Sequence, residues 1–242
     1  MSDCGARATV RIADAAFVLP HRGFIHQPIS GISPTDGSLS HPGAPSIQIN
    51  PGIDEVDTAR MEEYALLAAL LRRAPDSGLL KGLSRIRGDF TPLGAAHTAF
   101  ACAAEETDPE RLDREFFELF IGVGRGELLP YGSYYLTGFL NERPLARLRD
   151  DLRVLGITRT EGQTEPEDHA AILCEIMAGL AGETLATAPG AQKRLFEKHL
   201  APWIGRFFAY LEQVKNSNFY RCVGTVGRLF AEIETEAFAL PS

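Results

Sequence analysis

Asp168 and His169 are neighbours in residues 165–169 (EPEDH), and side chains of these types can carry acid–base chemistry. A histidine oriented by a carboxylate can activate a serine hydroxyl, for which Ser133 is a candidate. The sequence, however, contains no Gly-x-Ser-x-Gly elbow and no predicted strand that would position a nucleophile. We therefore predict that the protein is not an enzyme. A hydrolase with a cleft at His169 and Asp168 is kept as an alternative.

The same segment also suits the start of a helix. Thr164 and Glu167 have the spacing of a capping box, and acidic residues in a first helical turn interact favourably with the helix dipole. Consecutive helical residues point about 100° apart, so Asp168 and His169 cannot both be buried in one core. We expect one of them to face a loop or a cleft, where it can bind a partner's backbone or an arginine.

Residues 129–135 (LPYGSYY) hold three of the six tyrosines of the chain. A tyrosine offers a large apolar ring with a polar tip, and this combination suits a surface that contacts a peptide. Ordinary core packing at the start of a helix explains the cluster equally well. Both interpretations stay open at this point.

Other patterns give little support for a cofactor or a metal. Gly122, Gly124 and Gly126 lack the Gly-Lys-Ser/Thr ending of a phosphate loop, so a flexible connector is expected there. The four cysteines show no C-x-x-C pair and the chain has no Glu-x-x-His pairs for a di-iron centre. We predict neither a metal site nor a cofactor.

Composition limits the classes of partner. The 242 residues carry a formal net charge of −8, which argues against nucleic acid and suits a cationic partner. No apolar run approaches the roughly 20 residues that span a bilayer, and the N-terminus does not resemble a signal peptide. We expect a cytoplasmic protein without stable membrane insertion.

The periodicity of apolar residues after residue 53 is helical throughout. It predicts one all-α, multi-helix domain over residues 54–242. Residues 1–53 contain no Glu or Lys but many Pro, Gly and Ser, which predicts an irregular or mobile arm, or a translation start assigned upstream of the true one. The expected helices cover about residues 54–74, 91–104, 108–121, 142–155, 166–185, 192–214 (with Trp203 on its apolar stripe, and kinked or split at Pro202) and 218–240. A polar loop is expected over residues 158–164, and the expected cap residues are Asp54, Thr91, Asp108 and Asn141.

Three segments in this order resemble the TorD/DmsD/NarJ family of molybdoenzyme maturation chaperones. Residues 115–124 (EFFELFIGVG) are similar to the family's E-x-x-x-L-F-x-G-x-G, residues 130–135 (PYGSYY) to its P-P-W-x-S-x-Y/W, and residues 165–169 (EPEDH) to its E-P-x-D-H. The sequence departs from the pattern at Tyr131 and Tyr135, where tryptophan is common, and at Leu129, where a proline is usual. The sequence of residues 129–139 looks most similar to the sequences of chaperones that accompany formate dehydrogenases.

The resemblance implies a TorD-like helical fold and a cytoplasmic chaperone that binds the twin-arginine leader or the apo-form of a molybdopterin oxidoreductase. We expect the segments around residues 130–135 and 165–169 to meet in space and to line a groove that accepts a peptide. Acidic residues flanking this groove, with Glu118 and Glu127 besides Glu167 and Asp168 as candidates, would pair with the leader's arginines. A helical scaffold without leader specificity is a further alternative, and either a monomer or a helix-swapped dimer is compatible with the sequence. By motif match, the peptide-binding residues would be Asp168, His169 and Glu167, then Pro130, Tyr131, Ser133 and Tyr135, with Leu119 and Phe120 beneath them.

Overall fold

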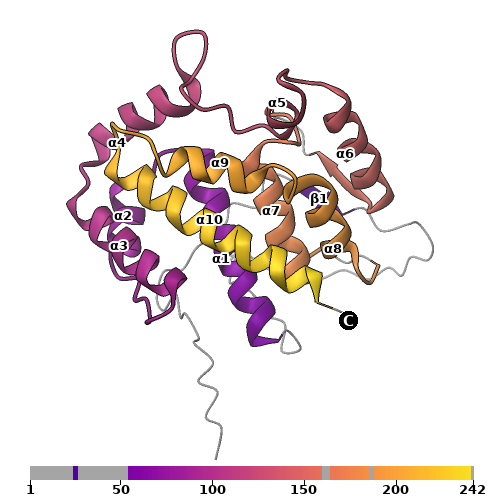
Figure 1. The fold of residues 1–242 in the computed structure, drawn as a ribbon, viewed down its shortest axis with the longest axis horizontal. Helices are drawn as coiled ribbons and strands as arrows, with labels where there is room; N and C mark the ends of the chain where they lie inside the picture. The colour runs from indigo at the N-terminus through magenta and orange to yellow at the C-terminus, as the bar shows by residue number, and fades with distance from the viewer. Residues whose placement is uncertain (1–23, 27–53, 160–163, 186–187, 241–242) are drawn as a thin grey trace, which may run out of the picture.

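Helix α1 (Glu55–Arg72) runs behind α10 from the middle of the molecule to its lower edge (Figure 1), and its C-terminal half is buried among the other helices. It begins where the Asp54 carboxylate accepts a hydrogen bond from the backbone N–H of Val56, at 3.3 Å, as the sequence predicts. The computed structural model describes residues 24–26, 54–159, 164–185 and 188–240.

Four further helices build the core with α1. Helix α7 (Ala170–Ala181) packs along α1, whereas α9 (Ile204–Leu211) packs with α10 (Asn218–Ala239). Helix α10 also contacts α1 and α3 (Pro92–Glu106), so it joins the two ends of the helical sequence. Figure 1 shows α10 crossing in front of α1.

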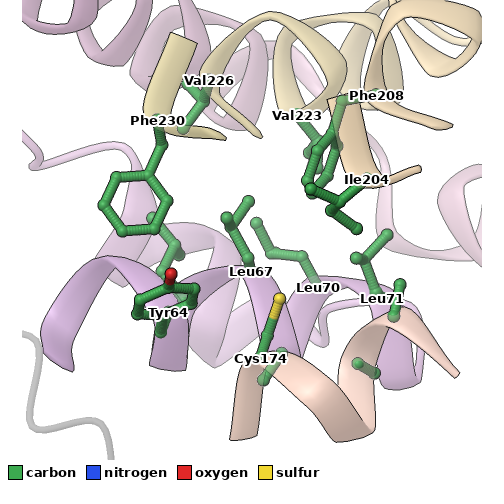
Figure 2. Packing of buried hydrophobic residues seen from close by; sticks show 14 of the residues in the cluster. Tyr64, Leu67, Leu70, Leu71, Cys174, Ile204, Phe208, Val223, Val226 and Phe230 are labelled. Carbon is green, nitrogen blue, oxygen red and sulfur yellow. The ribbon is translucent and has the colours of Figure 1, made fainter. Parts of the chain in front are cut away.

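The core between these helices is apolar and rich in aromatic rings (Figure 2). Tyr64 of α1 and Phe230 of α10 meet edge to face, with 4.7 Å between their ring centroids. Leu67 of α1, Phe208 of α9 and Cys174 of α7 are each no more than 1% exposed. Burial of this surface is the main force that holds α1 in place.

The remaining elements are shorter. The small antiparallel sheet pairs β1 (Phe24–His26) with β2 (Ile157–Arg159), in the register Ile25 to Thr158. Helices dominate the described residues, and the predicted all-α class is confirmed. The other helices are α2 (Ser77–Leu83), α4 (Pro109–Phe116), α5 (Gly132–Thr137), α6 (Arg143–Val154) and α8 (Ala191–Leu195), and two π-helical turns are η1 (Phe117–Ile121) and η2 (Phe196–Leu200).

Several boundaries follow the predicted local signals. Thr91 caps α3 by accepting from Gly94 N–H at 3.0 Å, and Asp108 caps α4 by accepting from Arg111 N–H at 2.8 Å. Pro202 has no N–H to donate and interrupts the last but one predicted helix. The structure accordingly splits that helix into α8, η2 and α9.

The predicted start of α7 is wrong. The helix begins at Ala170 and not at residue 166, and the proposed capping box of Thr164 and Glu167 does not form. His169 is the N-cap residue instead, and its Nδ1 accepts a hydrogen bond from Ala171 N–H at 3.1 Å. The backbone before Ala170 is extended because it pairs with a distant segment, which is described below.

Three smaller differences come from short elements. Glu142, and not Asn141, occupies the N-cap position of helix α6, although its side chain makes no capping hydrogen bond. Asn141 adopts a left-handed conformation with φ 59°. Strand β2 occupies the start of the loop predicted over residues 158–164, because it finds a partner strand in β1. The predicted helices include neither α2 nor α5. In the structure the Asp76 carboxylate caps α2 by accepting a hydrogen bond from Leu79 N–H at 2.8 Å.

The predicted N-terminal arm lies outside the described residues except for β1. The division of the chain at residue 53 therefore stays a prediction. Within the described residues, no helix combines the length and the apolar character that a bilayer span needs.

Gly224 of α10 permits the close approach of α9. A Cβ atom at this position would lie 2.3 Å from the backbone nitrogen of Glu212. We expect Gly224→Ala to lower the free energy of unfolding by about 1–3 kcal/mol, the usual cost of overpacking. Urea unfolding measures the change. The control is Gly205→Ala in α9, where the added Cβ meets no described atom within 4 Å apart from its chain neighbours and the nearby backbone of its own helix, and it should be neutral or stabilising. Equal effects of the two substitutions would contradict this account.

Candidate functional site

Residues 130–133 and 168–170 lie side by side and form what we call the seam. Tyr131 and His169 form an antiparallel β-bridge. The backbone N–H of Gly132 donates to the carbonyl of Asp168 at 2.9 Å, and that of Ala170 donates to the carbonyl of Pro130 at 2.7 Å. The predicted convergence of the tyrosine segment and the acid–histidine segment is thus confirmed.

Asp168 fixes the start of α5. Its Oδ2 accepts a hydrogen bond from Ser133 N–H at 2.7 Å, and the residue is only 4% exposed. A carboxylate at a helix N-terminus satisfies a backbone donor and favours the helix dipole. Its Oδ1 and the Ser133 hydroxyl oxygen are both buried without a hydrogen-bond partner among the described residues.

His169 connects the seam to α7. Besides capping that helix through Nδ1, its ring packs edge to face on Tyr131, with 5.0 Å between the centroids. Burial, assisted by the nearby positive charge of Arg72, lowers the pKa of His169 to about 3. The imidazole is therefore neutral at physiological pH, which its role as a hydrogen-bond acceptor at the cap requires.

Both members of the acid–histidine pair are buried, contrary to the expectation from helical geometry. Asp168 and His169 are 4% and 8% exposed, because they precede the helix and do not lie on it. Asp168 nevertheless lines a cavity, as described below. The hydrolase alternative is not supported, since Ser133 is fully buried and His169 Nδ1 is occupied by the cap.

Two further residues tie the seam to its surroundings. The Tyr131 hydroxyl donates to Glu165 Oε2 at 2.6 Å, and burial together with this carboxylate raises the pKa of Tyr131. Glu167 is 8% exposed, and its Oε2 accepts from Arg149 Nε of α6 at 2.8 Å. The predicted residue Glu167 is thus an anchor for α6.

Aromatic packing lies beneath the seam. Tyr135 stacks on Trp203, with 5.5 Å between the ring centroids, and contacts Phe207. Phe120 reaches the same Phe207 ring, and Leu119 beside it is 2% exposed. The predicted layer of Leu119 and Phe120 is therefore part of the core below Tyr135. Sequence reasoning placed Trp203 in a helix stripe and missed that it supports the site, although it is the only tryptophan of the chain.

A cavity of about 350 Å³ opens beside the seam, between α5, α6 and η2. Its charged lining is mostly cationic, with Arg143, Arg147 and Lys198 against the single carboxylate of Asp168. The sequence prediction did not include these cations, because their spacing in the chain does not reveal that α6 faces α5. The lining residues are Gly132, Ser133, Leu136, Thr137, Arg143, Pro144, Arg147, Leu148, Asp168, Lys198 and His199.

Glu118 and Glu127, together with Phe117, Ile121 and Val123, form what we call the acidic apolar surface. The backbone N–H of Glu127 donates to the carbonyl of Glu118 at 3.1 Å, so the glycine-rich loop folds back on η1. Phe117, Ile121 and Val123 on the same segment are 44%, 54% and 98% exposed. Exposed apolar side chains next to two acidic residues are typical of an interaction surface.

Comparison with known proteins places these features in a family. Residues 88–209, half of the chain, match the family model described as nitrate reductase delta subunit. This range includes the seam, the cavity and the acidic apolar surface. The match is therefore to the part of the chain that carries the candidate site.

Named relatives agree with the family model. The chain is 29% identical over 130 residues to the chaperone protein TorD of Vibrio cholerae, and the match covers 50% of this chain and 59% of the relative. It is 30% identical over 138 residues to TorD of Aliivibrio salmonicida, covering 53% and 64%. A Haemophilus influenzae protein named as a probable Tat proofreading chaperone, DmsD, is 27% identical over 129 residues, covering 52% and 62%. The chain thus spans less than two thirds of these relatives.

One solved structure is also similar. A redox enzyme maturation protein from Archaeoglobus fulgidus aligns with a TM-score of 0.47 and 20% identity, over 73% of this chain and 93% of that one. The relatives are named as chaperones and not as enzymes, which agrees with the non-enzymatic prediction. On the family model that covers half of its length, the chain belongs to the TorD/DmsD/NarJ family of redox-enzyme maturation chaperones, which includes the nitrate reductase delta subunit.

Proposed function

We propose that this protein is a cytoplasmic chaperone that binds the twin-arginine leader, or the apo-form, of a molybdopterin oxidoreductase before export. The observation that carries the proposal is the seam, in which Tyr131 and His169 of two distant family-like motifs meet. The sequence of residues 129–139 favours a formate dehydrogenase as the client. No cofactor of its own is needed for this role.

The predicted site residues divide into two groups by exposure. Buried residues position the binding surface, and half-exposed or exposed residues contact the peptide. Tyr131 and Tyr135 are half-buried and belong to the second group. The first group holds Asp168, His169, Glu167, Pro130, Ser133, Leu119 and Phe120.

The acidic apolar surface has the chemistry to bind a leader. A leader combines arginines with an apolar segment, and such a segment can lie on exposed Phe117, Ile121 and Val123. The arginines can then pair with the exposed carboxylates of Glu118 and Glu127. Arg125 links this surface to α5, since its guanidinium donates to the Tyr134 hydroxyl at 2.9 Å.

A chaperone must also release its client. An affinity near 1 μM, about −8 kcal/mol, suits a transient complex better than a nanomolar one. The two carboxylates lie at the surface, where water weakens each ion pair. The planar guanidinium can bind a carboxylate through two hydrogen bonds, and a lysine cannot. We therefore expect the surface to distinguish Arg-Arg from Lys-Lys.

The test is calorimetric titration with a synthetic leader peptide in an Arg-Arg and a Lys-Lys form. We expect the Lys-Lys form to bind several-fold more weakly. Replacing both carboxylates, Glu118→Gln with Glu127→Gln, should weaken binding of the Arg-Arg peptide about tenfold, or about 1.4 kcal/mol. The control is Glu236→Gln, an exposed carboxylate on α10.

Each result has a defined meaning. Equal affinity for both peptides would favour the helical scaffold without leader specificity. Unchanged affinity of the glutamine variant would remove the acidic apolar surface from the leader site. Asp168 and His169 are unsuited to such a test, because replacing buried capping residues changes folding as well as contact.

A further inference from the structure

Two arginines of α6 face the cavity beside the seam without a counter-ion. Arg143 and Arg147 are one helical turn apart, are exposed, and line the cavity. Neither makes an ion pair with any described residue. Lys198, the third cation, is already paired, since its Nζ lies 2.5 Å from Asp151 Oδ2. His199 Nε2 contacts the same oxygen at 2.6 Å.

The position of these arginines adds to the excess of positive charge. Arg143 is the first residue of α6, and a helix N-terminus carries a partial positive charge of its own. The N-cap residue Glu142 makes no side-chain hydrogen bond to the helix, and the first turn of α6 contains no acidic residue. Like charges four residues apart on a helix also repel each other. An anion near the two guanidinium groups would offset both the excess positive charge at the helix N-terminus and the repulsion between the arginines.

The inner wall of the cavity suits a hydrogen-bond donor and not an anion. Ser133 and Asp168 line it, and their Oγ and Oδ1 atoms are buried without a hydrogen-bond partner among the described residues. The Asp168 carboxylate repels an anion, so the anion must stay near the exposed arginines. A hydrogen-bond donor suits the inner wall, because leaving a buried acceptor unpaired is costly.

The rest of the lining is apolar. Leu136, Pro144 and Leu148 form walls of the cavity. The chain that connects α5 to α6 also exposes Phe139 and Leu140, at 69% and 44%. A ligand therefore needs an anion, an apolar part and an N–H donor. A peptide with acidic and apolar side chains has all three, whereas inorganic phosphate supplies the anion alone.

We propose that this cavity is a second binding site, which takes an acidic, partly apolar peptide segment of a protein partner. Carboxylates of the segment bind Arg143 and Arg147, and its backbone N–H groups face Asp168. The site differs in charge from the acidic apolar surface. One chaperone can thus hold a basic segment and an acidic segment at separate places.

Fluorescence anisotropy with short labelled peptides tests the site on the full chain. The probe is acetylated Leu-Asp-Glu-Leu amide carrying a fluorophore, and the matched probe is Leu-Asn-Gln-Leu. We expect the acidic probe to bind at least tenfold more tightly. The double variant Arg143→Gln with Arg147→Gln should remove that preference, with helical circular dichroism unchanged. The control Arg153→Gln lies on the same helix outside the cavity and pairs with Asp150.

Three results would overturn the proposal. They are equal binding of the two probes, equal effects of the double variant and the Arg153 control, and full displacement of the acidic probe by inorganic phosphate, which would indicate a general anion site. The leader peptide separates this site from the proposed function. The arginine variants should bind it normally, and the Glu118 and Glu127 variant should bind the acidic probe normally.

Discussion

Glu234→Ala should lower the free energy of unfolding by about 3 kcal/mol, the largest effect that we expect from a single substitution. Glu234 of α10 is 1% exposed and binds Arg60 of α1 through both oxygens, at 2.7 and 2.8 Å. It also accepts from the Tyr64 hydroxyl at 2.7 Å. Removing this carboxylate leaves a largely buried guanidinium and a buried hydroxyl without their partner. Asp57 lies 2.6 Å from Arg60 and still pairs with it after the substitution. The loss of stability is therefore expected at the lower end of the range of about 3–5 kcal/mol for breaking a buried ion pair.

The matched control for this substitution is Glu232→Ala on the same helix. Its side chain is 57% exposed and pairs with Arg228 at the surface, so its loss should cost at most about 1 kcal/mol. Urea unfolding followed by circular dichroism measures both changes. If the two variants were equally stable, the Arg60–Glu234 pair would not be the link that joins α1 to α10.

Acidification should destabilise the protein through His169. Because its pKa is lowered to about 3 in the fold and is about 6.5 in the unfolded chain, the unfolded state binds a proton first as the pH falls. The stability is fully present above pH 6.5 and decreases as the pH falls toward 3. At pH 5 the loss from this group is about 2 kcal/mol. The seam, which His169 joins to α7, should open with it.

The variant His169→Asn isolates this effect. Asparagine keeps a side-chain acceptor for the cap of α7 but does not titrate. The stability difference between the two proteins should therefore shift by about 2 kcal/mol in favour of the variant between pH 7.5 and pH 5. Other histidines cancel in the comparison. His97 is an example. Burial lowers its pKa, but the carboxylates of Glu63 and Asp89 together raise it further, so its own contribution to stability has the opposite slope in both proteins. A difference that does not depend on pH would show that His169 titrates normally.

The helices of this fold follow from local signals in the sequence. Asp54, Thr91 and Asp108 begin helices through hydrogen bonds over two or three residues, and Pro202 divides one through the chemistry of its own ring. Such interactions need no distant partner. The class of the fold and most helix boundaries were therefore predictable. The family resemblance also depended on short motifs and added the expectation that residues 130–135 and 165–169 meet.

The site depended more on tertiary contacts. The local pattern at Thr164 and Glu167 favours a helix start, but pairing with residues 130–133 keeps the backbone extended as far as His169. That pairing buries Asp168 and His169 together, which a helix could not do.

The sequence by itself determined the all-α class, the positions of most of the longer helices and the family that the chain resembles. Caps, periodic apolar residues and proline act within a few positions of the chain. Only the tertiary structure decided the start of α7, the cap that Asp168 provides to α5, and the meeting of Arg143 and Arg147 with Ser133 across a cavity. These features depend on segments that are distant in sequence. Their energies exist only once α5, α6 and α7 have packed together.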